Sequence, residues 1–176
     1  IFAAAGDVTA AHRAGCRYLD TLYRKPIPQR ADIVLVSQGG APKDLNLYQT
    51  QKALDNAKHA VRPGGIIILI GSCKEGLGEK CFERWIQEAK CSHNLIDRVQ
   101  THFELGGHKA AAIAMVLENA RIFLVSEMDP ELARKCFLEP YSSAQKALDD
   151  AFAILGSNAT VLAMPYGGST LPIVEQ

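Results

Sequence analysis

One stretch of this sequence places a cation and two amides along a single helix flank. The spacing of apolar residues predicts a helix over residues 46–62, and Gln49, Lys52 and Asn56 lie to one side of its apolar stripe. At about 100° per residue, the directions of Gln49 and Lys52 differ by about 60°. Such a flank is suited to lining a cleft, although any solvated helix edge has a similar composition.

The elements that must position this flank are a buried strand, a glycine turn and the helix itself. The apolar run Ile33–Val36 predicts a strand buried on both faces, as in a parallel or mixed sheet. Gly39 and Gly40 follow at its carboxyl end, where ligand sites gather in open α/β sheets. The double glycine either lets the backbone approach a ligand closely or simply turns the chain. The buried stripe of the helix is predicted to consist of Leu47, Thr50, Leu54, Ala57 and Val61.

The rest of the sequence alternates helices with strands. We expect further strands over residues 66–70, 122–125 and 160–164. The segment Pro63–Gly65 is expected to end the preceding helix just before the first of these strands. We expect further helices over residues 8–23, 80–90, 94–103, 108–119, 130–136 and 141–155. This alternation predicts the α/β class, with a parallel or mixed central sheet flanked by helices in three layers. A length of 176 residues is that of a single domain.

Two other places carry groups of chemical interest. His108 and Lys109 begin a predicted alanine-rich helix, where two basic groups oppose the positive end of the helix dipole. A nearby anion would relieve that conflict, so both are candidate cleft residues, although a plain surface position explains them equally well. Cys73 beside Lys74 is either a thiol with a lowered pKa or a buried structural cysteine.

Composition argues against several classes of protein. The formal net charge is zero, which gives no attraction to nucleic acid or to an anionic membrane. The five cysteines show no CxxC spacing, which argues against a disulfide framework or a structural zinc site and favours a reducing, cytoplasmic setting. The longest apolar run, Ile66–Ile70, is too short to span a bilayer. Because the sequence starts at Ile1 rather than at a methionine, we expect that an N-terminal part is missing.

No familiar catalytic signature occurs in the sequence. The motifs GxGxxG, GxxxxGK[ST], GxSxG and HExxH are all absent, and the five histidines show no metal-ligand spacing. The segment Val61–Gly65 before an apolar strand resembles an element of S-adenosylmethionine methyltransferases, but Ser37–Pro42 is a poor version of the glycine-rich loop that those enzymes need. A non-catalytic interaction module is a further alternative, which predicts an exposed apolar patch without convergent polar groups.

Several strings taken together resemble the C-terminal domain of the lactate racemase family, isomerases that use a nickel-pincer nucleotide. The longest are DIVLVSQGGAPKD (residues 32–44) and NLYQTQKALDNA (residues 46–57). The others are Ala11–Arg13, Cys73–Gly78, Phe103–Ala110 and Met164–Gly167. The resemblance covers nearly the whole chain in the right order.

The resemblance implies a racemase or epimerase of a 2-hydroxy acid such as lactate, working by reversible hydride transfer. It implies that the cofactor's lysine anchor, its nickel-binding histidine and the catalytic histidines belong to an N-terminal domain outside these 176 residues. The partners expected from it are therefore that domain and the small substrate, and this chain alone should be inactive. The resemblance does not choose among 2-hydroxy acids.

The resemblance also implies roles for individual residues. Lys52 and Gln49 match the Lys and Gln that the family contributes from this domain. Lys52 would pair with the substrate carboxylate or the developing keto oxygen, and Gln49 would donate a hydrogen bond that orients it. The same wall would be shaped by Tyr48, Gly39 and Gly40. A family motif is also matched by His108 and Lys109, for which the resemblance implies no role. Gln38, before the double glycine, is given no role.

Overall fold

A parallel five-stranded sheet forms the centre of the protein, for which a computed structural model describes residues 1–175. The strand order is β5-β4-β3-β2-β6, and every neighbouring pair is parallel. The strands are β2 (Ala31–Ser37), β3 (Val61–Ile70), β4 (Ala120–Val125), β5 (Glu139–Tyr141) and β6 (Val161–Met164). The predicted α/β class is confirmed, and the sheet is parallel rather than mixed.

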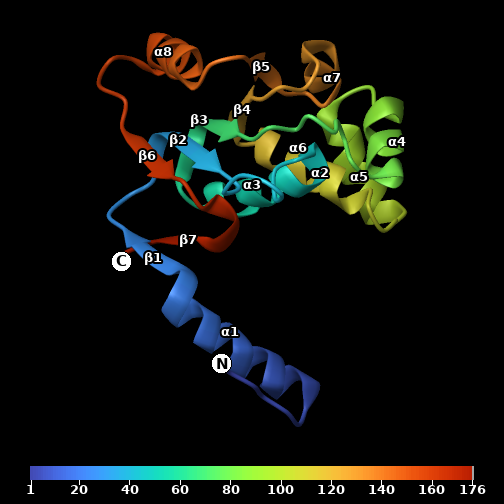
Figure 1. The fold of residues 1–176 in the computed structure, drawn as a ribbon, viewed down its shortest axis with the longest axis vertical. Helices are drawn as coiled ribbons and strands as arrows, with labels where there is room; N and C mark the ends of the chain where they lie inside the picture. Colours follow the sequence, from blue (N-terminus) through green and yellow to red (C-terminus); the bar gives the residue numbers. More distant parts are fainter. Residues whose placement is uncertain (176) are drawn as a thin grey trace.

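Helices cover both faces of this sheet and produce three layers (Figure 1). Along β3, Ile66 and Ile68 point to one face while Ile67 and Leu69 point to the other, because successive strand side chains alternate. The first pair packs with α8 (Ala144–Leu155). The second pair belongs to the larger core beneath α2 (Leu47–Thr50), α3 (Lys52–Ala57), α4 (Lys80–Glu88), α5 (Ser92–Thr101) and α6 (His108–Leu117). The short helix α7 (Pro130–Lys135) connects β4 to β5.

One helix stands apart from these layers. Helix α1 (Val8–Tyr23) is capped at its start by Asp7, whose carboxylate accepts a hydrogen bond from Ala10 N at 2.9 Å. It runs away from the sheet (Figure 1), and none of its residues, all of which the structure describes, is buried. Strand β1 (Arg24–Ile27) joins it to the domain by pairing in parallel with β7 (Leu171–Val174). Among the described residues, no helix is both long enough and apolar enough to traverse a membrane.

The predicted helix over residues 46–62 is wrong beyond Ala57. Two short helices, α2 and α3, meet at Gln51, and the second ends at Ala57. Strand β3 already begins at Val61, which pairs with Ala31, so the Pro63–Gly65 segment lies inside a strand instead of ending a helix. The register shifts between Ala31 and Ile33, because the β3 segment contains extra residues there.

Gly65 allows this irregular pairing. A Cβ atom on Gly65 would lie 2.6 Å from the backbone oxygen of Asp32, so only glycine lets the two strands approach here. Two further strand pairings were not predicted: β1 with β7, and β5 with β4. Tyr141, predicted to begin a helix, instead pairs with Val125 in β5. The helix begins only after Ser143, whose Oγ accepts a hydrogen bond from Lys146 N.

Strand order reverses direction at β2. The chain adds β3, β4 and β5 on one side of β2 and then returns to add β6 on the other side. At the amino ends, Asp32 ties these strands together by accepting hydrogen bonds from Thr160 N and Oγ1, both at 2.7 Å, and from Arg62 Nε at 2.5 Å. These bonds hold the pKa of Asp32 well below its usual range. The carboxyl ends of β2 and β6 are left to form a crevice, which is where ligands bind in open parallel sheets.

Candidate functional site

A cleft opens at the point where the strand order reverses. Its volume is about 630 Å³, and its walls come from the loop after β2, from α2 and α3, from the loop after β3 and from the 3-10 turn η1 (Gly167–Ser169). The polar residues that line it include Gln38, Lys43, Gln49, Lys52, Glu75 and Ser169. Two lysines and two glutamines against one glutamate make this cleft suited to an anion with polar substituents.

The predicted pair Gln49 and Lys52 meets in this cleft. Lys52 Nζ donates a hydrogen bond of 2.5 Å to Gln49 Oε1. The bond uses the amide oxygen of Gln49, so its NH₂ group stays available as a donor, and the lysine ammonium retains two more N–H donors. Lys52 is exposed and Gln49 is half-buried, so both reach the cleft. The pair therefore offers one positive charge and N–H donors from adjacent turns to the same ligand group.

The first turn of α2 is held from two sides. Asn46 caps it, because its Oδ1 accepts from Gln49 N at 3.1 Å. The loop after β3 binds the same turn through its backbone, since Gly76 O accepts from Leu47 N at 2.9 Å and Leu77 O accepts from Tyr48 N at 3.1 Å. All five residues of the predicted stripe are buried, but only Leu47, Thr50, Leu54 and Ala57 lie on the two helices and anchor their opposite side, because Val61 belongs to β3. Gln49 and Lys52 thus project from a fixed scaffold.

Gly39 and Gly40 form the turn beside the cleft. Their φ angles are +104° and +78°, a region that glycine adopts without strain. Gly39 also packs against Tyr166, since a Cβ on Gly39 would lie 3.3 Å from Tyr166 Cδ1. The side chains that line the cleft come from Gln38 before the turn and Lys43 after it. The double glycine therefore places the lining residues.

The residues that line the cleft do not include the predicted Tyr48, His108 and Lys109. Lys109 Nζ lies 5.5 Å from the centre of the Tyr48 ring. Burial lowers the pKa of Lys109, and the positive charge of Lys52 acts in the same direction. The His108 ring lies 5.7 Å from that of Phe103, and its Nδ1 accepts from Gly106 N at 3.2 Å. The structure thus gives His108 local contacts outside the cleft.

The segment Phe103–Ala110 is built around the buried Trp85. Glu104 accepts a hydrogen bond of 2.8 Å from Trp85 Nε1 and forms an ion pair with Arg84. These two hydrogen bonds, that from Arg84 first, lower the pKa of Glu104 from 4.5 to about 2. Gly107 faces the same indole ring, where a Cβ would lie 2.2 Å from Trp85 Cε2. The motif therefore has a structural explanation in the packing of α4 against α6.

Replacing Glu104 by glutamine should make the protein less stable in a pH-dependent way. Because its pKa is lower in the folded chain, Glu104 stabilises the fold above about pH 4.5, and this contribution is lost as the pH falls toward about 2. Thermal unfolding should show a lower Tm for E104Q at pH 7 and a difference that narrows from pH 4.5 downward. The control E131Q removes an exposed helix pair with Arg134 and should change little. A Tm difference that is the same at every pH would contradict this role.

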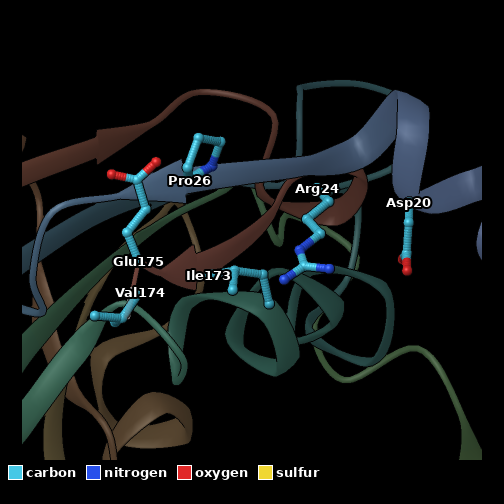
Figure 2. Close-up of a pocket in the computed structure, with 6 residues that line it drawn as sticks. All are labelled: Asp20, Arg24, Pro26, Ile173, Val174 and Glu175. Carbon is cyan, nitrogen blue, oxygen red and sulfur yellow. The ribbon is translucent and has the colours of Figure 1, made fainter.

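A second hollow, with a volume of about 590 Å³, lies where α1, β1 and β7 meet. Figure 2 shows the Arg24 side chain between Ile173 of β7 and Asp20 at the end of α1. None of the residues predicted for the site lines this hollow. We therefore assign the candidate site to the cleft between β2 and β6.

The described residues include no cluster of three or more His, Cys, Asp or Glu side chains arranged to hold a metal ion. The cysteines are free, and Cys73 and Cys136 are buried. Burial raises the pKa of the Cys136 thiol to about 12 and also raises that of Cys73. Cys73 is therefore a buried cysteine, and the alternative of a lowered thiol pKa beside Lys74 is wrong.

Sequence reasoning missed part of the cleft wall. The η1 turn contributes Gly168 and Ser169 to this wall. Asn56 Nδ2 holds the turn in place by donating a hydrogen bond of 2.6 Å to Gly167 O. Gln38 and Lys43 were also not chosen as site residues. The signal available for η1 was the glycine pair after the last predicted strand, because this position is again the carboxyl end of a parallel strand.

Fold and cleft together define a parallel α/β domain that presents a cation and amides at its topological switch point. Comparison with known proteins is more specific: residues 27–171 match the lactate racemase C-terminal domain, and the chain belongs to that family. It is 29% identical over 175 residues to the lactate racemase of Thermoanaerobacterium thermosaccharolyticum and 28% identical over 168 residues to that of Lactiplantibacillus plantarum. These alignments cover 95% and 93% of this chain but only 40% and 39% of those enzymes.

Solved structures agree with this assignment. The lactate racemase apoprotein from Thermoanaerobacterium thermosaccharolyticum superposes with a TM-score of 0.84 at 27% identity, covering 94% of this chain and 40% of that one. A protein from Thermotoga maritima shares the fold, with a TM-score of 0.66 at 16% identity over 95% of this chain and 42% of that one. The chain thus spans about 40% of the length of the curated relatives.

Proposed function

We propose that this chain is the C-terminal domain of a two-domain isomerase, a racemase or epimerase of a 2-hydroxy acid such as lactate. The observation that carries the proposal is the Lys52–Gln49 pair in the cleft where the strand order reverses. Membership of the lactate racemase C-terminal domain family supports it and leaves no support for the methyltransferase alternative. The convergent polar groups of the cleft argue against a purely apolar interaction module.

In this proposal, Lys52 binds the substrate carboxylate and Gln49 orients it. Inversion requires the C–H bond at the α-carbon to break and to re-form on the other face, so the carboxylate must stay fixed meanwhile. Lys52 supplies a charge-assisted hydrogen bond, and the Gln49 amide, held by its own bond to Lys52, donates a second one. The same donors would also stabilise negative charge that develops on the hydroxyl oxygen.

The family implies a nickel-pincer nucleotide, whose chemistry is to accept and return a hydride. Residues 1–175 contain no arranged set of His, Cys, Asp or Glu ligands that fits its metal. We therefore derive no step of the reaction through this group on this chain. We propose that the cofactor and the acid–base residues are carried by an N-terminal domain of the full-length enzyme, and that this chain alone is inactive.

The surface beside α1 supports a contact with that domain. Helix α1 exposes large apolar side chains, including Tyr18, Leu19, Leu22 and Tyr23. A hollow of about 390 Å³ runs between this helix and η1 and shares Gly168 and Ser169 with the candidate cleft. The curated relatives are long enough to contain a further domain. We propose that this domain covers α1 and so comes to lie beside the cleft. We also propose that the enzyme is cytoplasmic, because free cysteines are typical of a reducing compartment.

The test uses the full-length protein loaded with the nickel-pincer cofactor. Incubation with a panel of 2-hydroxy acids that includes lactate and malate should show inversion at the α-carbon of at least one member by chiral chromatography. Inversion would establish the reaction class and name a substrate. An enzyme with bound cofactor that inverts no 2-hydroxy acid would contradict the proposal, and so would saturable binding of S-adenosylmethionine in the cleft.

A further inference from the structure

A small pocket lies at the amino ends of β3 and β4, whereas the candidate cleft lies at the carboxyl ends of the strands. Its volume is about 280 Å³. Three of its nine lining residues are basic, and none is acidic. The basic residues are Arg30, Lys58 and His59. The apolar lining residues are Val61, Pro63, Met115, Val116 and Ala120. The pocket therefore combines a group of basic side chains with an apolar wall.

The three basic side chains lie close enough to repel one another. Partial desolvation lowers the pKa of His59, and the positive charges of Lys58 and Arg30 lower it further, whereas Asp55 acts in the opposite direction. Lys58 and His59 follow the last turn of α3, where positive charge also favours the helix dipole. Arg30 comes from the segment before β2, so the helix does not explain its place in this group.

The acidic side chains of the domain neutralise only part of this charge. Lys58 Nζ pairs with Asp55 Oδ1 at 3.2 Å. Among residues 1–175, Arg30 and His59 have no side-chain hydrogen bond and no ion pair. The guanidinium of Arg30 is therefore available to an anion, and its N–H donors form a fork that fits the two oxygens of a carboxylate.

The apolar wall gives the pocket a second kind of contact. Its floor consists of the buried residues Val61, Val116 and Ala120. Met115, in contrast, is 48% exposed, so it presents apolar surface that a ligand can cover. The volume of about 280 Å³ is close to the lower limit of ~300 Å³ for typical ligand pockets, so only a small molecule fits.

We propose that this pocket binds a small organic carboxylate, whose charged group pairs with Arg30 and Lys58 while its apolar body covers Met115. A neutral molecule would leave the cations unpaired, and an inorganic anion would leave the apolar wall in water. No residue of this pocket lines the candidate cleft, so the inference is independent of the proposed function.

His59 is expected to make this binding depend on pH. A bound carboxylate favours the protonated imidazole, so binding should tighten as the pH falls and His59 takes up a proton. The charged groups that act on His59 are Lys58, Arg30 and Asp55. The side chains that α6 and β4 contribute to the pocket carry no charge.

The experiment measures the Kd of three probes by calorimetry on the full-length protein. Benzoate carries a carboxylate and an apolar ring, benzamide carries the ring without the charge, and acetate carries the charge with almost no apolar body. We expect benzoate to bind at least about tenfold more tightly than either of the others, and R30Q to weaken benzoate about 10- to 100-fold. Lowering the pH from about 8 to about 5.5 should tighten benzoate binding about two- to fivefold, and H59Q should remove this change.

R134Q is the matched control, because Arg134 is exposed on α7, pairs with Glu131 and lies outside this pocket. It should leave benzoate binding unchanged, and so should K52A, since Lys52 belongs to the candidate cleft. Binding that is lost in K52A but kept in R30Q would place the anion in the candidate cleft and overturn the inference. Equal affinity for benzamide, a Kd for benzoate that does not change with pH, or no saturable binding of benzoate would overturn it as well.

Discussion

Replacing Lys52 by alanine in the full-length enzyme is expected to lower kcat by about 100- to 1,000-fold, the usual effect of removing a donor that stabilises developing charge. Lys52 brings the only positive charge of the Gln49–Lys52 pair, and its loss also frees Gln49 from the bond that orients it. Since residues 1–175 contain no metal-ligand cluster, nickel content should stay unchanged. Chiral chromatography and metal analysis on the same preparation give the two readouts.

The matched control for this substitution is K58A. Lys58 follows α3, is exposed and pairs with Asp55 on the surface at 3.2 Å, away from the cleft lining. It should retain the turnover of the unsubstituted enzyme. Full turnover in K52A would remove Lys52 from the site. A K52A enzyme that had also lost its nickel would show that Lys52 supports cofactor binding rather than the substrate.

The second large effect concerns stability and is expected for Gly107→Ala. The backbone angles at Gly107 are φ −59° and ψ −33°, which alanine adopts freely, so backbone strain is not the cause. The added methyl would instead lie 2.2 Å from Trp85 Cε2. That ring is fully buried, donates to Glu104 and carries the Arg98 guanidinium 4.4 Å from its centre, so it has little room to move.

Overpacking of this kind costs about 3 kcal/mol, which for a chain of this length lowers Tm by roughly 10 °C. Thermal unfolding of the 176-residue chain, followed by circular dichroism, measures the effect. Gly15→Ala in α1 is the matched control, because a Cβ there meets nothing within 4 Å and alanine favours a helix. A Tm for G107A equal to that of the unsubstituted chain would show that the Trp85 pocket is loosely packed.

The sequence by itself determined the main elements of the core. The apolar runs at Ile33–Val36 and Ile66–Ile70 predicted the two central strands, and the helical stripe is buried as predicted from Leu47 to Ala57. Such patterns are local, because periodic burial follows directly from helix and strand geometry. The flank that carries Gln49 and Lys52 was predictable for the same reason, since it is the side of the helix adjacent to that stripe.

Other features were decided only by tertiary structure. The β1–β7 pair joins Arg24 to Leu171, and local patterning carries no information about contacts over such a separation. The early start of β3 at Val61 depends on pairing with Ala31, which overrides the helical pattern of the preceding residues. The cleft itself forms because η1 returns beside β2 and brings Gly168 against Gln38. The enclosure of Gln38 Oε1, which has no hydrogen-bond partner among the described residues, is therefore a property of the assembled fold, because burial is set by residues distant in the chain.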